Sequence, residues 1–191
     1  MPNIPNGAHL IRTAIDLAHK LHAGQRRKGF ALPYIVHPSD VFIRLLRWGV
    51  EDDIILSAAM LHDAIEDCPG TTAEKLAAVV GWPVANLVEE LTYDGPLNNA
   101  SAKARWIETF RSKSGEALIV KLADRYCNVR DFMLTDLSYA QIYLQKADPL
   151  FYALQERKSA INGRFGRTTS LTVSGSFCRL EQDLEQELRR L

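Results

Sequence analysis

The residues best placed to do chemistry lie at the end of one apolar stretch, IILSAAMLHDAIED, which covers residues 54–67. Its first half has the composition of a core helix, and its last part carries His62, Asp63, Glu66 and Asp67. On a continuous helix, residues three or four apart share a face, so His62 lies over Glu66, and Asp63 lies beside Glu66 and Asp67. An imidazole and three carboxylates at the inner end of a core helix carry a large desolvation cost unless a positive charge sits among them. The pattern therefore predicts a divalent metal ion at this end of the helix.

Two further positions offer nitrogen or oxygen ligands where an apolar helix ends or begins. His37 precedes a proline at a predicted helix entry, and Asp124 follows the apolar run ALIVKLA. Each alone has an ordinary explanation, because His-Asp dipeptides are mostly structural and Asp124 can pair with the adjacent Arg125. Together with His62 and Asp63, which lie about 100° apart around a helix axis, they suit one divalent ion. The predicted metal ligands are His37, His62, Asp63 and Asp124.

Glu66 and Asp67 follow the His-Asp pair by about one helical turn. At that distance a carboxylate can hydrogen-bond a water molecule at the metal or a leaving oxygen. A metal lowers the pKa of its water, and a nearby carboxylate can accept the proton and return it. The ordinary alternative is that both side chains cap solvent-facing turns. We predict that Glu66 and Asp67 form a catalytic acid-base pair.

A basic loop leads directly to His37. The loop GQRRKGFALPYIVHP contains Arg26, Arg27 and Lys28, and guanidinium and ammonium groups bind phosphate. A solvated basic loop is the default interpretation, but this one must end at the proposed metal. Elsewhere, Asn128 shares a helix face with Asp124 and could hydrogen-bond a ribose or base. Two weaker candidates are Tyr143, otherwise a core tyrosine, and Lys103, otherwise a surface residue.

Helical periodicity runs through most of the chain and predicts an all-α fold of about eight or nine helices. One helix is expected from about residue 8 to residue 22, and a second closes at Gly49. We assign residues 1–162 to one domain. The segment 163–176, GRFGRTTSLTVSGS, is expected to be a flexible linker or a small hairpin. Residues 177–191 have leucines at helical spacing, so they are expected to dock on the domain or on a second subunit.

Composition argues against several kinds of partner and against a membrane or disulfide-rich protein. The 191 residues contain 23 basic and 23 acidic side chains, so net charge does not favour nucleic acid or an anionic membrane as a partner. No apolar stretch reaches the roughly 20 residues of a membrane span, and the N-terminus lacks the features of a signal peptide. We therefore expect a cytoplasmic location. The three cysteines lack CxxC spacing, which argues against a disulfide framework or a thiolate zinc site.

The ordered series HAGQRRKGFALPYIVHP, AAMLHDAIED and LIVKLADRYCN resembles the HD-domain hydrolases of the RelA/SpoT alarmone enzymes. Within these it is most similar to the small stand-alone hydrolases related to the metazoan SpoT homologue. The likeness covers about residues 8–146 and includes spacing as well as residue type. In that family, a helical bundle holds one Mn²⁺ per chain and removes the 3′-pyrophosphate of guanosine tetra- or pentaphosphate (ppGpp or pppGpp) in the stringent response.

The resemblance also implies roles for individual residues. It assigns metal binding to His37, His62, Asp63 and Asp124, and catalysis to Glu66 and Asp67. Nucleotide contacts fall on Arg27, Lys28 and Asn128, with Tyr143 and Lys103 as weaker matches. The chain departs from the common pattern at Cys68 and Cys127, neither of which is a ligand position. No synthetase domain follows, so we expect removal of the alarmone without its synthesis.

The sequence therefore predicts a metal-dependent pyrophosphohydrolase that gives GDP or GTP plus pyrophosphate. One alternative is an HD phosphohydrolase acting on another nucleotide, such as a nucleotide monophosphate or NADPH. A second is a non-catalytic module that binds alarmone, which the intact acid pair and ligand set disfavour. The nucleotide is the expected partner, with a second copy of the chain as a further candidate.

Overall fold

The computed structural model describes residues 7–96, 99–167 and 169–190, and within them it contains twelve α-helices, one 3-10 helix and no named strand. A single antiparallel bridge joins Arg26 to Pro33 in the basic loop. The predicted all-α class is confirmed. The first six residues, which bear on the predicted absence of a signal peptide, and the C-terminal Leu191 lie outside the described residues. No helix of the described residues is both long and apolar enough to cross a membrane.

The chain divides into two compact units, Met1–Asp94 and Gly95–Leu191. The boundary predicted at residue 162 therefore falls inside the second unit. The helices of the first unit are α1 (Gly7–Leu21), α2 (Val36–Arg47), α3 (Asp53–Leu61), α4 (Ala64–Asp67), α5 (Ala73–Val80) and α6 (Trp82–Leu91). Those of the second are α7 (Ala100–Glu108), the 3-10 helix η1 (Thr109–Arg111), α8 (Gly115–Met133), α9 (Leu137–Gln145), α10 (Asp148–Glu156), α11 (Lys158–Phe165) and α12 (Thr169–Leu188).

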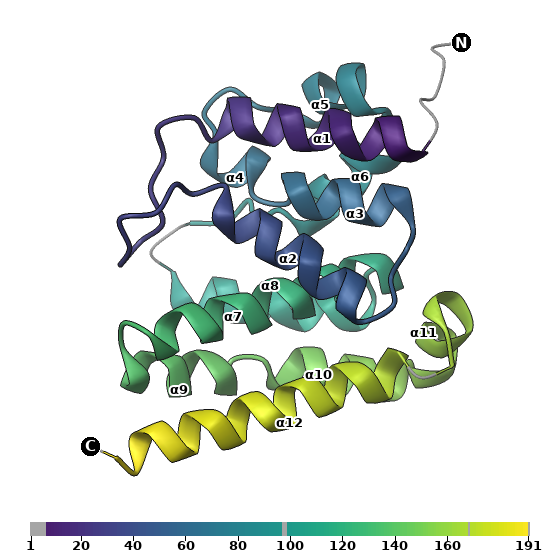
Figure 1. The fold of residues 1–191 in the computed structure, drawn as a ribbon. Helices are drawn as coiled ribbons and strands as arrows, with labels where there is room; N and C mark the ends of the chain where they lie inside the picture. The colour runs from purple at the N-terminus through teal and green to yellow at the C-terminus, as the bar shows by residue number, and fades with distance from the viewer. Residues whose placement is uncertain (1–6, 97–98, 168, 191) are drawn as a thin grey trace. The chain divides into compact units, whose positions relative to one another are not determined.

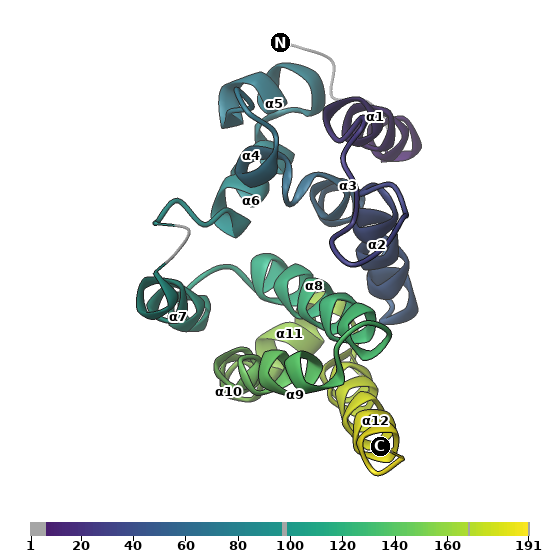
Figure 2. The same ribbon diagram turned by 90° about the vertical axis from the view of Figure 1, so that its left-hand side faces the viewer.

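Helix α3 is the centre of the first unit and packs against α1, α2 and α6 (Figures 1 and 2). Every residue from Ile55 to Leu61 is buried, which explains why this helix is apolar on all sides. Its start is fixed by Asp52, whose side chain accepts hydrogen bonds from the backbone N–H groups of Ile54 and Ile55. Because α3 is buried, the two residues that follow it, His62 and Asp63, have a fixed position in the first unit.

The predicted single helix over residues 54–67 is wrong, because the helix breaks at the His-Asp pair. Helix α3 ends at Leu61, and α4 begins at Ala64. Between them, Asp63 has φ −98° and ψ 0°, in the sparsely populated bridge region between helix and strand. The break replaces the predicted stacking of His62 over Glu66 and directs the His62 and Asp63 side chains toward each other. Similar breaks elsewhere raise the number of helices above the eight or nine predicted.

In the second unit, α8 buries more residues than any other described helix, and it packs against α9, α10 and α12. The predicted linker or hairpin over residues 163–176 is wrong. Residues up to Phe165 belong to α11, Gly166 ends that helix with φ +122°, and α12 is one continuous helix. The second unit buries Val173, Phe177, Leu180 and Leu184 of α12. Helix α12, which contains most of the C-terminal segment, therefore packs against α8 and α9 of its own chain.

Candidate functional site

The junction between α3 and α4 places an imidazole against a carboxylate. The His62 Nδ1–H group donates to the carbonyl oxygen of Ala59, at 2.8 Å. In the neutral ring the lone pair therefore lies on Nε2, which is 3.0 Å from Asp63 Oδ2. His62 is only 3% exposed. The main chain of α3 thus selects the tautomer in which Nε2 is available as a ligand.

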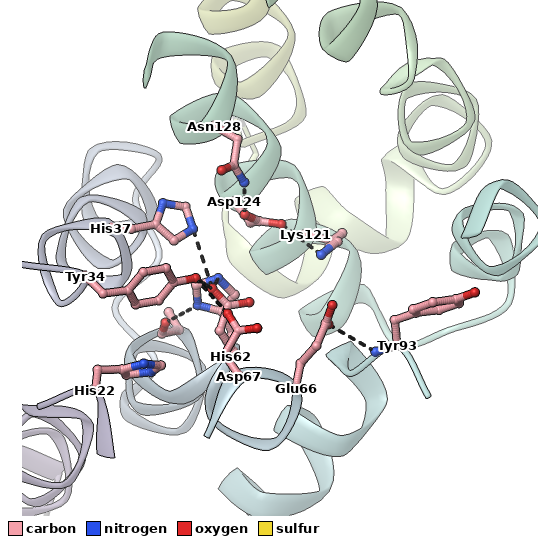
Figure 3. Close-up of polar contacts among 12 residues, drawn as sticks. His22, Tyr34, His37, His62, Glu66, Asp67, Tyr93, Lys121, Asp124 and Asn128 are labelled. Carbon is pink, nitrogen blue, oxygen red and sulfur yellow. Dashed lines mark hydrogen bonds and ion pairs between the residues drawn. The ribbon is translucent and has the colours of Figure 1, made fainter. Parts of the chain in front are cut away.

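His37 brings a second imidazole to the same oxygen. It lies in the first turn of α2, where its backbone N–H donates to the carbonyl oxygen of Tyr34 at 2.9 Å. Its side chain is 2% exposed, and its Nε2 atom lies 3.8 Å from Asp63 Oδ2. The His37 and His62 rings are 5.3 Å apart at an angle of 60°. The structure therefore brings together three of the four predicted ligands within the first unit. Figure 3 labels the two histidines of this group.

This donor set fits a divalent metal ion. Two imidazole nitrogens and a carboxylate oxygen, mostly buried, are ligands that zinc, manganese and similar ions accept. A nitrogen lone pair facing a carboxylate oxygen becomes favourable when a positive charge, a proton or a metal ion, lies between them. The same contacts that order the three side chains also leave their ligand atoms facing one another.

The predicted acid-base pair diverges in space. Asp67, at the end of α4, has its Oδ2 atom 3.1 Å from the Tyr34 hydroxyl. Burial, followed by the negative charge of Asp63, raises the pKa of Asp67 above its ordinary value. Glu66 instead accepts a hydrogen bond from the backbone N–H of Tyr93 at 3.4 Å (Figure 3). The two carboxylates therefore have different contacts, and Asp67 is linked through Tyr34 to Asp63. His37, His62 and Asp63 are called the metal-side residues below.

Tyr34 is a site residue that the sequence analysis missed. Its hydroxyl donates to Asp63 Oδ2 at 2.5 Å, and burial, with the charge of Asp63, raises the pKa of the phenol so that it keeps its proton. The signal available in the sequence was its place in PYIVHP, three residues before His37, where the turn into α2 keeps the two side chains near each other. Their ring centroids are 6.0 Å apart.

The basic loop places one of its predicted phosphate-binding residues beside this cluster. The Arg27 guanidinium carbon lies 5.8 Å from the centre of the Tyr34 ring, within reach of a cation–π contact. Arg27 is half-buried, whereas Lys28 is exposed on the same loop. Arg27 is therefore positioned by the same tyrosine that contacts Asp63.

In the second unit, Asp124 is buried on α8 and held by its neighbours on the same helix face. It is 4% exposed, and its Oδ2 atom lies 2.8 Å from Lys121 Nζ. The amide of Asn128 donates to Oδ1 of the same carboxylate (Figure 3). Residues 121, 124 and 128 lie three and four apart, so one face of α8 carries them all. Lys121 thus holds the carboxylate in place.

The remaining predicted residues also lie in the second unit. Tyr143 stacks under the guanidinium of Arg125, with the guanidinium carbon 4.0 Å from the ring centre. The centroids of the Tyr143 and Phe132 rings are 5.1 Å apart. Burial raises the pKa of the Tyr143 hydroxyl. Lys103 is exposed on α7. A nucleotide contact from either residue remains a prediction.

Comparison with known proteins gives the family. Residues 14–159 match the HD domain. The guanosine-3′,5′-bis(diphosphate) 3′-pyrophosphohydrolase MESH1 of Xenopus tropicalis is 36% identical over 165 residues, covering 82% of this chain and 91% of that protein. The human MESH1 is 40% identical over 121 residues, covering 62% of this chain and 66% of that protein. An Aquifex aeolicus protein with the same enzyme name is 34% identical over 133 residues, but the match spans only 19% of its length.

A solved structure agrees with the sequence comparisons. It is described as a metazoan ortholog of SpoT that hydrolyzes ppGpp and plays a role in starvation responses. The match has a TM-score of 0.74 at 26% identity and covers 89% of this chain and 94% of the other. The match to the HD domain spans most of the chain and includes the His62-Asp63 pair. This chain belongs to the HD-domain family.

Proposed function

We propose that this chain is a metal-dependent pyrophosphohydrolase that removes the 3′-pyrophosphate of guanosine tetra- or pentaphosphate and gives GDP or GTP and pyrophosphate. The observation that carries the proposal is the His37, His62 and Asp63 cluster, in a chain similar over most of its length to proteins named for this reaction. Proteins of that name occur both among animals and among bacteria.

The proposed cofactor is one Mn²⁺ ion. In the first unit, His37, His62 and Asp63 would hold it, and the fourth ligand is assigned to Asp124 by the family resemblance. When bound, such an ion polarises phosphoryl oxygens and lowers the pKa of adjacent water. The preference for Mn²⁺ over other divalent ions also rests on the resemblance, since nitrogen and oxygen ligands suit several of them.

Five further residues would bind the nucleotide. Arg27 and Lys28 would neutralise phosphate charge, and the flat guanidinium of Arg27 could also stack on the base. Asn128 would hydrogen-bond the ribose or base, with Tyr143 and Lys103 as further nucleotide contacts. These roles place positive charge where the substrate carries most of its negative charge.

The carboxylates of α4, Glu66 and Asp67, would take part in the proton transfers of hydrolysis. Water attacks the phosphorus joined to the ribose 3′ oxygen, and the bond between this phosphorus and the 3′ oxygen breaks. One carboxylate accepts the proton from the water, and the 3′ oxygen needs a proton as it leaves. We assign the base to Asp67, because the Tyr34 hydroxyl links its carboxylate to Asp63, one of the proposed metal ligands. Glu66, held by the backbone of Tyr93, would orient the water or the leaving group.

A product assay tests the proposal. Protein stripped of metal and then supplied with Mn²⁺ is expected to release pyrophosphate and GDP in equal amounts from guanosine tetraphosphate, and a chelator should stop the reaction. A panel of other nucleotides, including NADPH and nucleotide monophosphates, provides the comparison. Release of phosphate from one of them, with no pyrophosphate from the alarmone, would identify a different phosphohydrolase. Alarmone binding without turnover would identify a non-catalytic module.

Replacing Arg27 with alanine is expected to raise KM for the alarmone about tenfold or more, with a smaller change in kcat. A hydrogen bond to a charged group contributes about 1.5–3 kcal/mol, and about 1.4 kcal/mol corresponds to a factor of ten. Steady-state kinetics over a range of nucleotide concentrations measures the change. Arg12→Ala is the matched control, because it removes the same charge from an exposed position on α1. Equal KM values for the two variants would contradict the assigned role of Arg27.

The proposed substrate also suggests a setting. An enzyme that consumes guanosine tetraphosphate would act in the cytoplasm, in the removal of alarmone during the stringent response. A second copy of the chain as a partner remains a prediction from the sequence.

A further inference from the structure

We propose that Tyr34 is a positioning residue, whose hydroxyl joins the metal-side carboxylate of Asp63 to the catalytic carboxylate of Asp67. The proposal rests on the proposed function of the site. The phenol oxygen lies 2.5 Å from Asp63 Oδ2 and 3.1 Å from Asp67 Oδ2. These two carboxylates come from the helix junction and from the end of α4.

Four contacts hold the main chain and the ring of Tyr34 in place. The backbone N–H of Tyr34 donates to the carbonyl oxygen of Gln25 at 3.0 Å. The side chain of Gln25 in turn donates to the carbonyl oxygen of Asp67 at 2.9 Å. The buried ring of His22 lies 4.8 Å from the Tyr34 ring, and its Nδ1–H group donates to Gln25 Oε1 at 2.7 Å. Tyr34 and the main chain of Asp67 are therefore tied to the same residue.

The hydroxyl contacts an oxygen of Asp63 that also faces the imidazoles. Asp63 Oδ2 lies 3.0 Å from His62 Nε2 and 3.8 Å from His37 Nε2. Carboxylates that bind metals are usually oriented by a hydrogen bond from a neighbouring group. A donor to Oδ2 thus restricts rotation of the Asp63 carboxylate and sets the direction in which this oxygen points.

The same group controls the spacing of two negative charges. Carboxylates a few ångströms apart repel each other, so each tends to rotate away from its neighbour. A shared O–H group between them offsets part of this repulsion and keeps Asp67 beside the metal-side residues. Both carboxylates accept from this one O–H group, and the shorter contact identifies Asp63 as the principal acceptor. The longer contact holds the Asp67 carboxylate near Asp63 without neutralising it.

A purely structural role would depend on the ring of Tyr34 and not on its oxygen. The Tyr34→Phe variant separates the two roles, since it keeps the ring beside His22 and Arg27 and removes only the hydroxyl. Tyr152→Phe is the matched control, because Tyr152 is 67% exposed on α10. Circular dichroism and thermal unfolding of both variants establish that they fold like the wild type.

The Tyr34 hydroxyl contacts Asp63 and Asp67, and we call this pair of contacts the bridge. One measurement tests its effect on metal binding and another its effect on turnover. Mn²⁺ binding to the metal-free protein, measured by calorimetry without nucleotide, is expected to weaken about tenfold or more in Tyr34→Phe. At saturating Mn²⁺, kcat for pyrophosphate release is expected to fall about tenfold, with KM unchanged. Tyr152→Phe should match the wild type in both. If Tyr34→Phe retains either the wild-type metal affinity or the wild-type kcat, the bridge is refuted.

A double variant tests directly whether Tyr34 affects kcat through Asp67. If Tyr34 acts on turnover through Asp67, adding Tyr34→Phe to Asp67→Asn should reduce kcat little further, because residues acting as one unit are not additive. Independent, multiplicative losses would overturn the proposal. A wrong substrate assignment gives a different result, because the wild type then releases no pyrophosphate while the difference in metal affinity between wild type and Tyr34→Phe remains.

Discussion

Replacing Asp63 with asparagine is expected to abolish tight metal binding and to lower kcat/KM for pyrophosphate release by about 1,000-fold or more. The amide has nearly the same shape, but it lacks the charge that the two imidazoles face. Asp63 Oδ2 is the atom common to the contacts with His37, His62 and Tyr34. Loss of this one charge therefore affects every metal-side contact of the first unit.

Metal content of the purified variant, measured by elemental analysis, and the pyrophosphate assay provide the two readouts. Asp16→Asn is the control, because it makes the same chemical change at an exposed position on α1 of the same unit. The control should bind metal and turn over substrate like the wild type. Wild-type turnover by Asp63→Asn would show that the reaction does not depend on this cluster.

The clustering of His37, His62 and Asp63 was predictable because polar residues interrupt apolar segments there. His62 and Asp63 end the most apolar helix of the chain, and His37 stands at the start of another. The break between α3 and α4 was not predictable from periodicity, because alanine, leucine, isoleucine and glutamate on both sides favour a continuous helix. Tertiary contacts of α4 with α6 override that local preference.

Tyr34 and α12 show two other limits of the sequence. Tyr34 lies on an irregular loop, where no periodicity marks a functional side chain, and its partners Asp63 and Asp67 are 29 and 33 residues away. In α12, glycine, serine and threonine predicted a linker. The helix instead buries small residues such as Ser170 and Ser176, so packing outweighs their low helix propensity.

Replacing Asp67 with asparagine is expected to lower kcat about 100- to 1,000-fold, in the range attributed to a general acid or base. The amide oxygen of the new side chain would still accept a hydrogen bond from Tyr34, so the geometry of the site should persist while the proton acceptor is lost. Glu66→Gln is the matched variant and should cost less, because Glu66 contacts the backbone of Tyr93 instead. Single-turnover kinetics at saturating Mn²⁺ compares the two. A larger loss in Glu66→Gln would transfer the role of base to Glu66.

The same substitution is expected to stabilise the metal-free protein at neutral pH. Burial and the charge of Asp63 raise the pKa of Asp67 in the folded state, so the folded protein binds this proton more tightly than the unfolded chain does. The stabilising contribution of the carboxyl group is therefore complete below its unfolded pKa and is lost as the pH rises through the raised pKa. At neutral pH the carboxyl group of Asp67 therefore opposes folding, and an asparagine does not.

Denaturant unfolding in a chelating buffer, repeated from about pH 3 to pH 7, measures this effect as the free energy of unfolding of Asp67→Asn minus that of the wild type. The range brackets the ordinary pKa of an aspartate and neutrality. The difference should become more positive as the pH rises. A flat or falling difference would contradict the assigned environment of Asp67. A rising one would mean that the proposed catalytic base is held at a cost in stability, which a bound cation beside Asp63 would reduce.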